Sequence, residues 1–321
     1  MPPPRVLAGI EGRLPPEIAA KAEADGVAKA GQDGITLLTL GLLGGAFIAF
    51  GAIFSNVALT GAEGAVPFGL ARVVAGLVFA VGLSMVLLAG AQIFTGDVLM
   101  VMAWASGRLN LRQVVRAWGL VWLGNFAGAL GTALLVLLAG HHLFGGGQVG
   151  LTALRTAEAK AALPFARAFL LGVLCNTLVC LAIWLSLSSR QPAHRFVVVV
   201  LPIAAFVAAG FEHAVANMYV LSFGLLIKAA GADPFWHAIG ASQDAFPHLD
   251  LLGATSNIVA VTLGNVAGGA FLVAGAYWLL YRRPMRLSAA GEAAGSASSA
   301  PGPAAEPKAG DRALPQRIDL P

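Results

Sequence analysis

The chain has 321 residues, of which 58% are hydrophobic and only 11% are charged, and its formal net charge is +4. Soluble domains carry about 25% charged residues, so a water-soluble globule of this composition would lack the polar side chains to cover its surface. The composition argues against a soluble enzyme or a nucleic-acid-binding domain and indicates an all-α membrane protein.

The first 33 residues are rich in charged side chains and precede the first long apolar stretch. Within them, residues 13–31 place Ile18, Ala22 and Val27 among charged residues. This pattern predicts a short amphipathic helix that lies along the membrane surface. Residues 1–33 are therefore expected to form a cytoplasmic segment outside the bilayer.

Six stretches without Asp, Glu, Lys or Arg follow, apart from one interruption in the fifth, and a helix needs about 20 apolar residues to cross a bilayer. They cover residues 34–62, 73–96, 117–154, 168–189, 196–227 and 251–281. We expect six transmembrane helices within residues 34–286. Residues 287–321 are rich in Ala, Gly, Ser and Pro, which predicts a disordered cytoplasmic tail.

Lysine and arginine mark one side of the membrane. Twelve of them fall in the N-terminal segment, the second and fourth connections and the region after the sixth stretch. The other connections hold Arg155 and Lys160 clearly, with Arg72, Arg167 and Lys228 at span edges. Because cytoplasmic loops carry the excess of positive charge, we expect a multi-pass inner-membrane protein with both termini in the cytoplasm.

Sequence landmarks recur in the two halves of the chain. Residues 94–96 (Phe-Thr-Gly) and 123–125 (Leu-Gly-Asn) have counterparts at 210–213 (Gly-Phe-Glu-His) and 263–265 (Leu-Gly-Asn). Each half holds three spans, and an odd number of spans reverses the second half in the membrane. This inverted repeat is typical of transporters and channels whose sites lie at interrupted helices near the midplane.

The second and fifth spans carry the signs of such interruptions. Glu212 and His213 divide the fifth span, and Gly96 and Asp97 follow Thr95 at the end of the second. An ionisable side chain at membrane depth marks a functional site by default, and imidazole exchanges a proton near neutral pH. We expect the Thr95 hydroxyl to face a substrate or His213, and Glu212 to accept hydrogen bonds at the break.

Lys160 lies before the fourth span, in what the sequence predicts to be an external loop. An exposed lysine near a pore mouth attracts anions. No spacing of His, Cys, Asp or Glu typical of a metal site occurs in the sequence, and we expect no cofactor.

Four segments together resemble the formate/nitrite transporter family. They are residues 91–130, TAEAK at 156–160, GFEHAVANMY at 210–219 and TLGNVAGG at 262–269, within a similarity that covers about residues 15–283. The resemblance implies an aquaporin-like protomer, a homopentamer, and one pore per protomer with two apolar constrictions around a central histidine.

The resemblance also implies roles for individual residues. His213 matches the central histidine, Thr95 the threonine on the loop that breaks the second span, Asn176 a polar neighbour in the pore, and Lys160 the vestibule lysine. The constrictions would use Phe79, Leu83 and Phe206. The supporting polar residues would be Glu212 and Asn217.

These matches predict a channel or transporter for small monovalent anions, with formate ranked first and nitrite second. A proton delivered through His213 would turn the anion into a neutral acid, whose desolvation costs much less. Hydrosulfide or another short carboxylate remains an alternative substrate. An aquaporin-like pore for neutral solutes would carry Asn-Pro-Ala boxes at the breaks, and an intramembrane enzyme would carry a nucleophile or metal motif; the sequence has none of these. The expected partners are the anion, protons, the lipid bilayer and four further copies of the chain.

Overall fold

The computed structural model describes residues 12–285, and these contain helices but no strand. The predicted tail over 287–321 and the first eleven residues lie outside the described residues. The helices are α1 (Pro15–Ala30), α2 (Gly34–Leu59), α3 (Phe68–Ala89), α4 (Phe94–Asp97), η2 (Val98–Met100), α5 (Val101–Ala105), α6 (Leu111–Leu138), η3 (His141–Leu143), α7 (Gln148–Ala161), α8 (Phe165–Ser188), α9 (Pro192–Ala208), α10 (Ala214–Ala230), α11 (Asp233–Ile239), η4 (Gln243–Ala245), α12 (Leu251–Ala267), η5 (Gly268–Gly275) and η6 (Trp278–Arg282).

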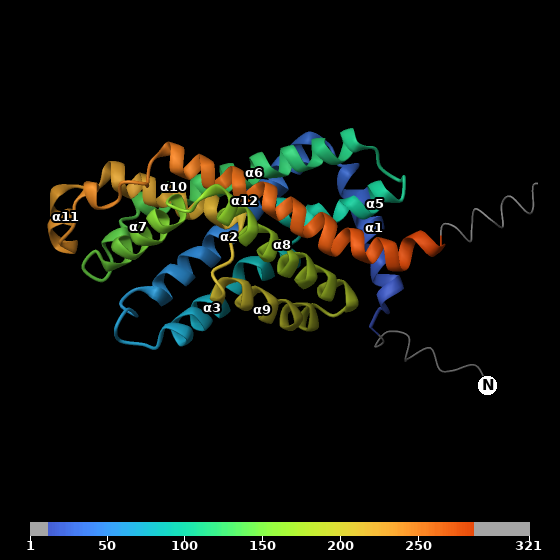
Figure 1. Cartoon of the computed structure of the whole chain (residues 1–321), viewed down its shortest axis with the longest axis horizontal. Helices are drawn as coiled ribbons and strands as arrows, with labels where there is room; N and C mark the ends of the chain where they lie inside the picture. Colours follow the sequence, from blue (N-terminus) through green and yellow to red (C-terminus); the bar gives the residue numbers. More distant parts are fainter. Residues whose placement is uncertain (1–11, 286–321) are drawn as a thin grey trace, which may run out of the picture. The chain divides into compact units, whose positions relative to one another are not determined.

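The membrane crossings are made by continuous and by interrupted helices. Among the described residues, α2, α3, α6, α8 and the continuous helix Leu251–Met285 are each long and apolar enough to cross a bilayer. Helices α9 and α10, of 17 residues each, form the interrupted fifth span. The predicted all-α class with six spans is confirmed. Figure 1 shows α7 and α11 at one end of this unit and α1 and α5 at the other.

Several helices begin before the charge-free stretches that predict them. Arg72, Arg116, Arg167 and Arg195 lie inside the starts of α3, α6, α8 and α9. A long arginine side chain can bury its methylene groups beside apolar surface and still direct its charge to water. The helices therefore extend past these arginines and begin earlier than the charge-free stretches predict.

The prediction of one span over 117–154 is wrong in its second half. Helix α6 ends at Leu138, and the separate helix α7 begins at Gln148. Gly140, Gly145, Gly146 and Gly147 between them all have positive φ angles. Glycine adopts this left-handed conformation without a steric penalty, so the chain turns here although it carries no charge.

Both predicted interruptions are confirmed. Helix α3 ends at Ala89 and is followed by Gly90 with φ +82°, and α9 is followed by Gly210 with φ +74°. After each glycine a short non-helical segment leads into a new helix, which begins at Phe94 in the first half and at Ala214 in the second. The second and fifth spans are therefore broken in the same way.

Glycines allow the helices of each half to pack at backbone contact. A Cβ atom on Gly45 of α2 would lie 2.1 Å from the carbonyl oxygen of Asn125, and one on Gly128 of α6 would lie 2.0 Å from that of Leu42. In the second half, a Cβ atom on Gly264 of α12 would lie 2.2 Å from the carbonyl oxygen of Phe169 in α8. Small residues serve this purpose in membrane helices generally.

Helix α1 lies inside the predicted amphipathic stretch. It is hydrogen-bonded to the end of the last span. The buried Glu23 carboxylate accepts hydrogen bonds from Ser106 Oγ at 2.6 Å and from Arg282 Nε at 2.7 Å. Burial raises the pKa of Glu23, but the hydrogen bonds from Arg282, Ser106 and Arg108 outweigh it and hold the pKa below its ordinary value. This contact therefore persists at neutral pH and weakens only as the pH falls through that lowered pKa.

The glycine packing predicts different effects for two substitutions in α6. Gly128→Ala places a methyl group against the Leu42 carbonyl and should lower the unfolding temperature in detergent, since overpacking costs about 1–3 kcal/mol. Gly131→Ala is the control, because a Cβ atom there meets nothing within 4 Å. Equal unfolding temperatures for the two variants would contradict the packing assigned to Gly128.

Candidate functional site

The two broken spans bring Thr95 and His213 together inside the protein. Thr95 Oγ1 lies 2.9 Å from His213 Nε2. Both residues are buried, with 0% and 3% of their surface exposed. The juxtaposition expected from the inverted repeat is therefore present in the structure, although these residues are 118 positions apart in the sequence.

His213 also caps the helix that follows it. Its Nδ1 atom accepts a hydrogen bond of 3.1 Å from the backbone N–H of Ala216, in the first turn of α10. Because a backbone amide only donates, Nδ1 carries no proton in this arrangement. The neutral ring therefore holds its proton on Nε2 and donates it to Thr95 Oγ1. The Thr95 hydroxyl accepts this bond, so its own hydrogen is available to another acceptor.

Asn125 in α6 satisfies the backbone at the first break. Its Oδ1 atom accepts the N–H of Phe94 at 2.8 Å, at the start of α4. Its Nδ2 atom donates to the carbonyl oxygens of Gly41 at 2.7 Å and Gln92 at 2.9 Å. One buried amide thus joins α2, α6 and the broken segment.

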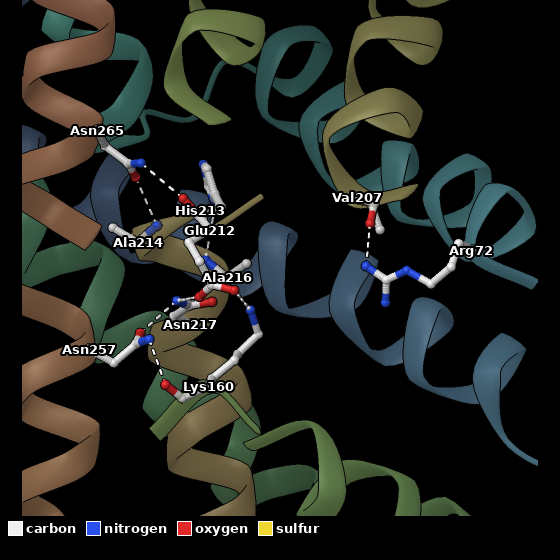
Figure 2. Close-up of polar contacts among 10 residues, drawn as sticks. All are labelled: Arg72, Lys160, Val207, Glu212, His213, Ala214, Ala216, Asn217, Asn257 and Asn265. Carbon is white, nitrogen blue, oxygen red and sulfur yellow. Dashed lines mark hydrogen bonds and ion pairs between the residues drawn. The ribbon is translucent and has the colours of Figure 1, made fainter. Parts of the chain in front are cut away.

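Asn265 in α12 makes the matching contacts at the second break. Its Oδ1 atom accepts the N–H of Ala214 at 2.9 Å, and its Nδ2 atom donates to the carbonyl oxygens of Gly172 at 2.8 Å and Glu212 at 3.0 Å. Figure 2 shows Asn265 beside Ala214 and Glu212. The repeated Leu-Gly-Asn motif contains both asparagines, but its recurrence alone does not reveal that they bind the backbone of the two breaks.

Asn176 lies between the two breaks and does not line the large cavity described below. Its Nδ2 atom donates to the carbonyl oxygens of Thr95 at 3.1 Å and Asn265 at 2.6 Å, and the residue is completely buried. Asn176 therefore links Thr95 at the first break to Asn265, which binds the backbone of the second break.

Glu212 belongs to a closed ring of hydrogen bonds with Lys160, Asn217 and Asn257. Its carboxylate accepts from Lys160 Nζ at 2.7 Å and from Asn217 Nδ2 at 2.6 Å. Asn217 Nδ2 also donates to Asn257 Oδ1, and Asn257 Nδ2 donates to the carbonyl oxygen of Lys160. Figure 2 shows this ring closed. It satisfies the Glu212 carboxylate, as sequence analysis expected, and adds Asn257, which that analysis missed.

Lys160 is neither in a loop nor freely exposed, and both expectations are corrected. It lies in the last turn of α7, where only 19% of its side chain is exposed. Its ammonium group is paired with Glu212. The ion pair forms because the break directs the Glu212 carboxylate toward α7, a tertiary contact that the local sequence does not reveal.

A cavity of about 700 Å³ leads from the surface to this centre. It is lined by Glu63 and Arg155 toward the surface and by Phe79, Phe206 and His213 at depth. The rings of Phe79 and Phe206 meet edge to face with centroids 5.7 Å apart, and that of Phe206 lies 5.8 Å from the His213 ring. Apolar rings therefore lie directly against the polar centre.

The third predicted constriction residue, Leu83, is placed differently. It is 1% exposed, one helical turn beyond Phe79 on α3, and it does not line this cavity. The structure therefore separates it from the Phe79–Phe206 pair along α3.

The cavity carries an excess of positive charge. Its charged lining residues are four cations and two carboxylates: Arg72, Arg155, Lys160, Arg167, Glu63 and Glu212. Arg72 donates to the carbonyl oxygen of Val207 at 2.5 Å, as Figure 2 shows, and to that of Ala208 at 3.4 Å, both at the C-terminal end of α9. It thereby offsets the negative end of this helix. Among the described residues, no group of three His, Cys, Asp or Glu side chains is placed to hold a metal ion.

Comparison with known proteins gives a consistent result. A family model described as formate/nitrite transporter matches residues 16–279. The chain is 41% identical over 271 residues to the formate channel FocA of Escherichia coli strain K12, covering 84% of this chain and 95% of that protein. A probable formate transporter of Methanothermobacter thermautotrophicus is 34% identical, covering 76% of this chain and 88% of that protein.

A solved structure has the same fold. The structure described as a pentameric formate channel with formate bound matches with a TM-score of 0.74 and 35% sequence identity. The match covers 77% of this chain and 97% of that one.

The hydrogen bonds of Asn265 predict a measurable local effect when this side chain is replaced. Asn265→Leu should accelerate amide hydrogen exchange at residues 212–216 and lower the unfolding temperature, because each buried group left unpaired costs roughly 1–3 kcal/mol. Thr177→Val serves as the control, since Thr177 Oγ1 bonds only within its own helix, to Val173 O. Unchanged exchange at 212–216 in Asn265→Leu would show that the break holds without the brace.

Proposed function

Because the chain belongs to the formate/nitrite transporter family, we propose that it conducts formate through a pore within each protomer. The observation that carries the proposal is the positively charged cavity that ends at the buried Thr95–His213 pair. The name of the Escherichia coli relative, a formate channel, supports formate as the anion. Nitrite is the second candidate, since the family description includes it.

The arrangement suits a small monovalent anion. Arg72, Lys160 and Arg167 contribute to the positive potential that draws an anion into the cavity. Lys160 attracts the anion less than an isolated lysine would, because Glu212 offsets its charge. The rings of Phe79 and Phe206 then force the anion to shed water, which is costly for a charge that finds no hydrogen-bond donor.

His213 and Thr95 lower that cost. We expect the His213 Nε2–H and the Thr95 hydroxyl to serve as hydrogen-bond donors to the carboxylate oxygens. Delivery of a proton would lower the cost further by forming the neutral acid, but it requires the imidazolium ring. In that state Nδ1 carries a proton and loses the hydrogen bond from Ala216. The geometry therefore favours charge stabilisation by the neutral ring, and proton transfer is coupled to loosening of the first turn of α10.

The assembly and orientation follow from further observations. We propose a homopentamer, because the matched solved structure is described as pentameric. We propose that both ends of the membrane unit face the cytoplasm. The hydrogen bond between Arg282 at the end of the last span and Glu23 in α1 supports a shared side, and the excess of lysine and arginine on that side supports the cytoplasm.

The proposed function predicts formate flux by the purified protein. Proteoliposomes that contain it should take up labelled formate faster than empty vesicles, with nitrite as a weaker competitor. Native mass measurement of the same preparation should give five chains. Absence of formate uptake by an intact pentamer would contradict the proposed substrate, and a transporting monomer would contradict the proposed assembly.

Replacement of His213 tests its part in transport. His213→Asn retains a hydrogen-bonding side chain of similar size, so the pentamer should assemble, but the rate and the pH profile of formate uptake should both change, because the imidazole that would stabilise the anion or deliver a proton is absent. His213→Phe should reduce uptake most strongly, because a third aromatic ring would adjoin Phe79 and Phe206. A His213→Asn pentamer with the parent's rate and pH profile would show that the histidine serves only to pack and cap the helix.

A further inference from the structure

Two aromatic rings lie in contact at the inner end of the large cavity. Phe79 of α3 and Phe206 of α9 are both buried, and their rings meet edge to face with centroids 5.7 Å apart. On the proposed path, an anion passes between rings in contact only when one of them moves. The freedom of Phe206 to move depends on how firmly the end of α9 is held.

Helix α9 alone does not hold its own end firmly. Pro202 lies four residues before Phe206 and cannot donate the backbone hydrogen bond of a helix interior. The helix is followed by Gly210, whose φ angle is +74°. The part of α9 that carries Phe206 therefore lies between a proline and a turn, and a contact from another helix is needed to fix it.

Arg72 of α3 supplies this contact. Its Nη2 atom donates to the carbonyl oxygen of Val207 at 2.5 Å, as Figure 2 shows, and its Nε atom donates to that of Ala208 at 3.4 Å. These are the two residues directly after Phe206. The last carbonyls of a helix have no partner further along it and form its negative end. The rigid, planar guanidinium binds two of them at once and so restricts the end of α9.

Arg72 and Phe79 lie on the same face of α3. They are seven residues apart, which is close to two helical turns, and Gly76 lies between them on this face. A Cβ atom on Gly76 would lie 2.5 Å from the carbonyl oxygen of Ala204, so α3 and α9 meet there at backbone contact. One face of α3 thus holds the end of α9 and presents the ring that Phe206 meets.

We propose that Arg72 is a positioning residue for the aromatic constriction and sets how large a carboxylate the proposed pore admits. It acts through Phe206 by keeping the end of α9 against α3. With this end held, the constriction opens by rotation of a ring alone, which suits a one-carbon anion. With the end released, α9 moves away from α3 and a two-carbon anion passes more easily. The inference rests on the proposed function and adds the residue that restricts substrate size.

The charge of Arg72 alone would have a different effect. A cation of the cavity raises the local concentration of every monovalent anion, formate and acetate alike. Loss of the charge would therefore lower both uptake rates together and leave their ratio unchanged. A positioning role changes the ratio, so the ratio of the two rates separates the two roles.

Parallel uptake assays with the full-length protein in proteoliposomes measure this ratio. Arg72→Met retains a long side chain but has no N–H donor. The ratio of the initial rates of labelled acetate and labelled formate should rise about tenfold, the size of effect that one hydrogen bond from a charged group can have. Arg167→Met is the matched control, because Arg167 is an exposed cation of the same cavity and lies in α8. It should lower both rates and keep the parent's ratio.

A double-mutant cycle tests whether Arg72 acts through Phe206. Phe206→Ala should raise the ratio by itself, and Arg72→Met added to it should raise the ratio no further. A rise of the same size in both backgrounds would overturn the proposal. Arg72→Lys guards against misfolding of Arg72→Met, because it keeps the charge and one donor nitrogen, and its ratio should lie between those of Arg72→Met and the parent.

The remaining outcomes separate this inference from the proposed function. If every Arg72 variant that assembles as the parent does also keeps the parent's ratio, the positioning role is refuted, but the proposed function stands. If the parent itself takes up no formate, the proposed function fails, and the positioning role fails with it.

Discussion

A helix that breaks inside a bilayer exposes backbone N–H and C=O groups where no bulk water can satisfy them. Asn125 and Asn265 meet this constraint, each by accepting one backbone N–H and donating to two carbonyl oxygens. Glycines of α2, α6, α8 and α12 allow the helices to approach closely enough for these short side chains to reach. The position of Thr95 against His213 depends on both asparagines, because Thr95 and His213 each lie directly beside a backbone group that one of these asparagines binds.

The second break gives one side chain two tasks. His213 ends the non-helical segment, so its Nδ1 atom caps α10 while Nε2 points to Thr95. The cap determines which nitrogen carries the proton and therefore presents a donor at the centre of the path. The cavity that His213 lines has an excess of positive charge. This charge suits the proposed anionic substrate, which the hydrogen-bond donors at the centre would stabilise.

The sequence predicts the repeat, the two breaks and the Thr95–His213 contact, because inverted symmetry brings equivalent positions together. It predicts span ends less well, since arginines such as Arg72 fit inside helix termini and the glycines at 145–147 turn the chain without any charge. Some site residues were also predicted correctly and others were not. Lys160 was wrongly expected to be exposed because its partner Glu212 is 52 residues away, and only the fold brings the two together. Asn257 was missed for the same reason.

The central claim is that the His213 ring is fixed as an Nδ1 acceptor and an Nε2–H donor. Nitrogen-15 solid-state NMR of histidine-labelled protein in lipid bilayers measures this directly, with the His213 signals identified by their loss in His213→Asn. At neutral pH we expect an unprotonated Nδ1 and a protonated Nε2 whose shift changes in Thr95→Val. A proton on Nδ1, or an Nε2 signal that does not respond to Thr95→Val, would contradict it.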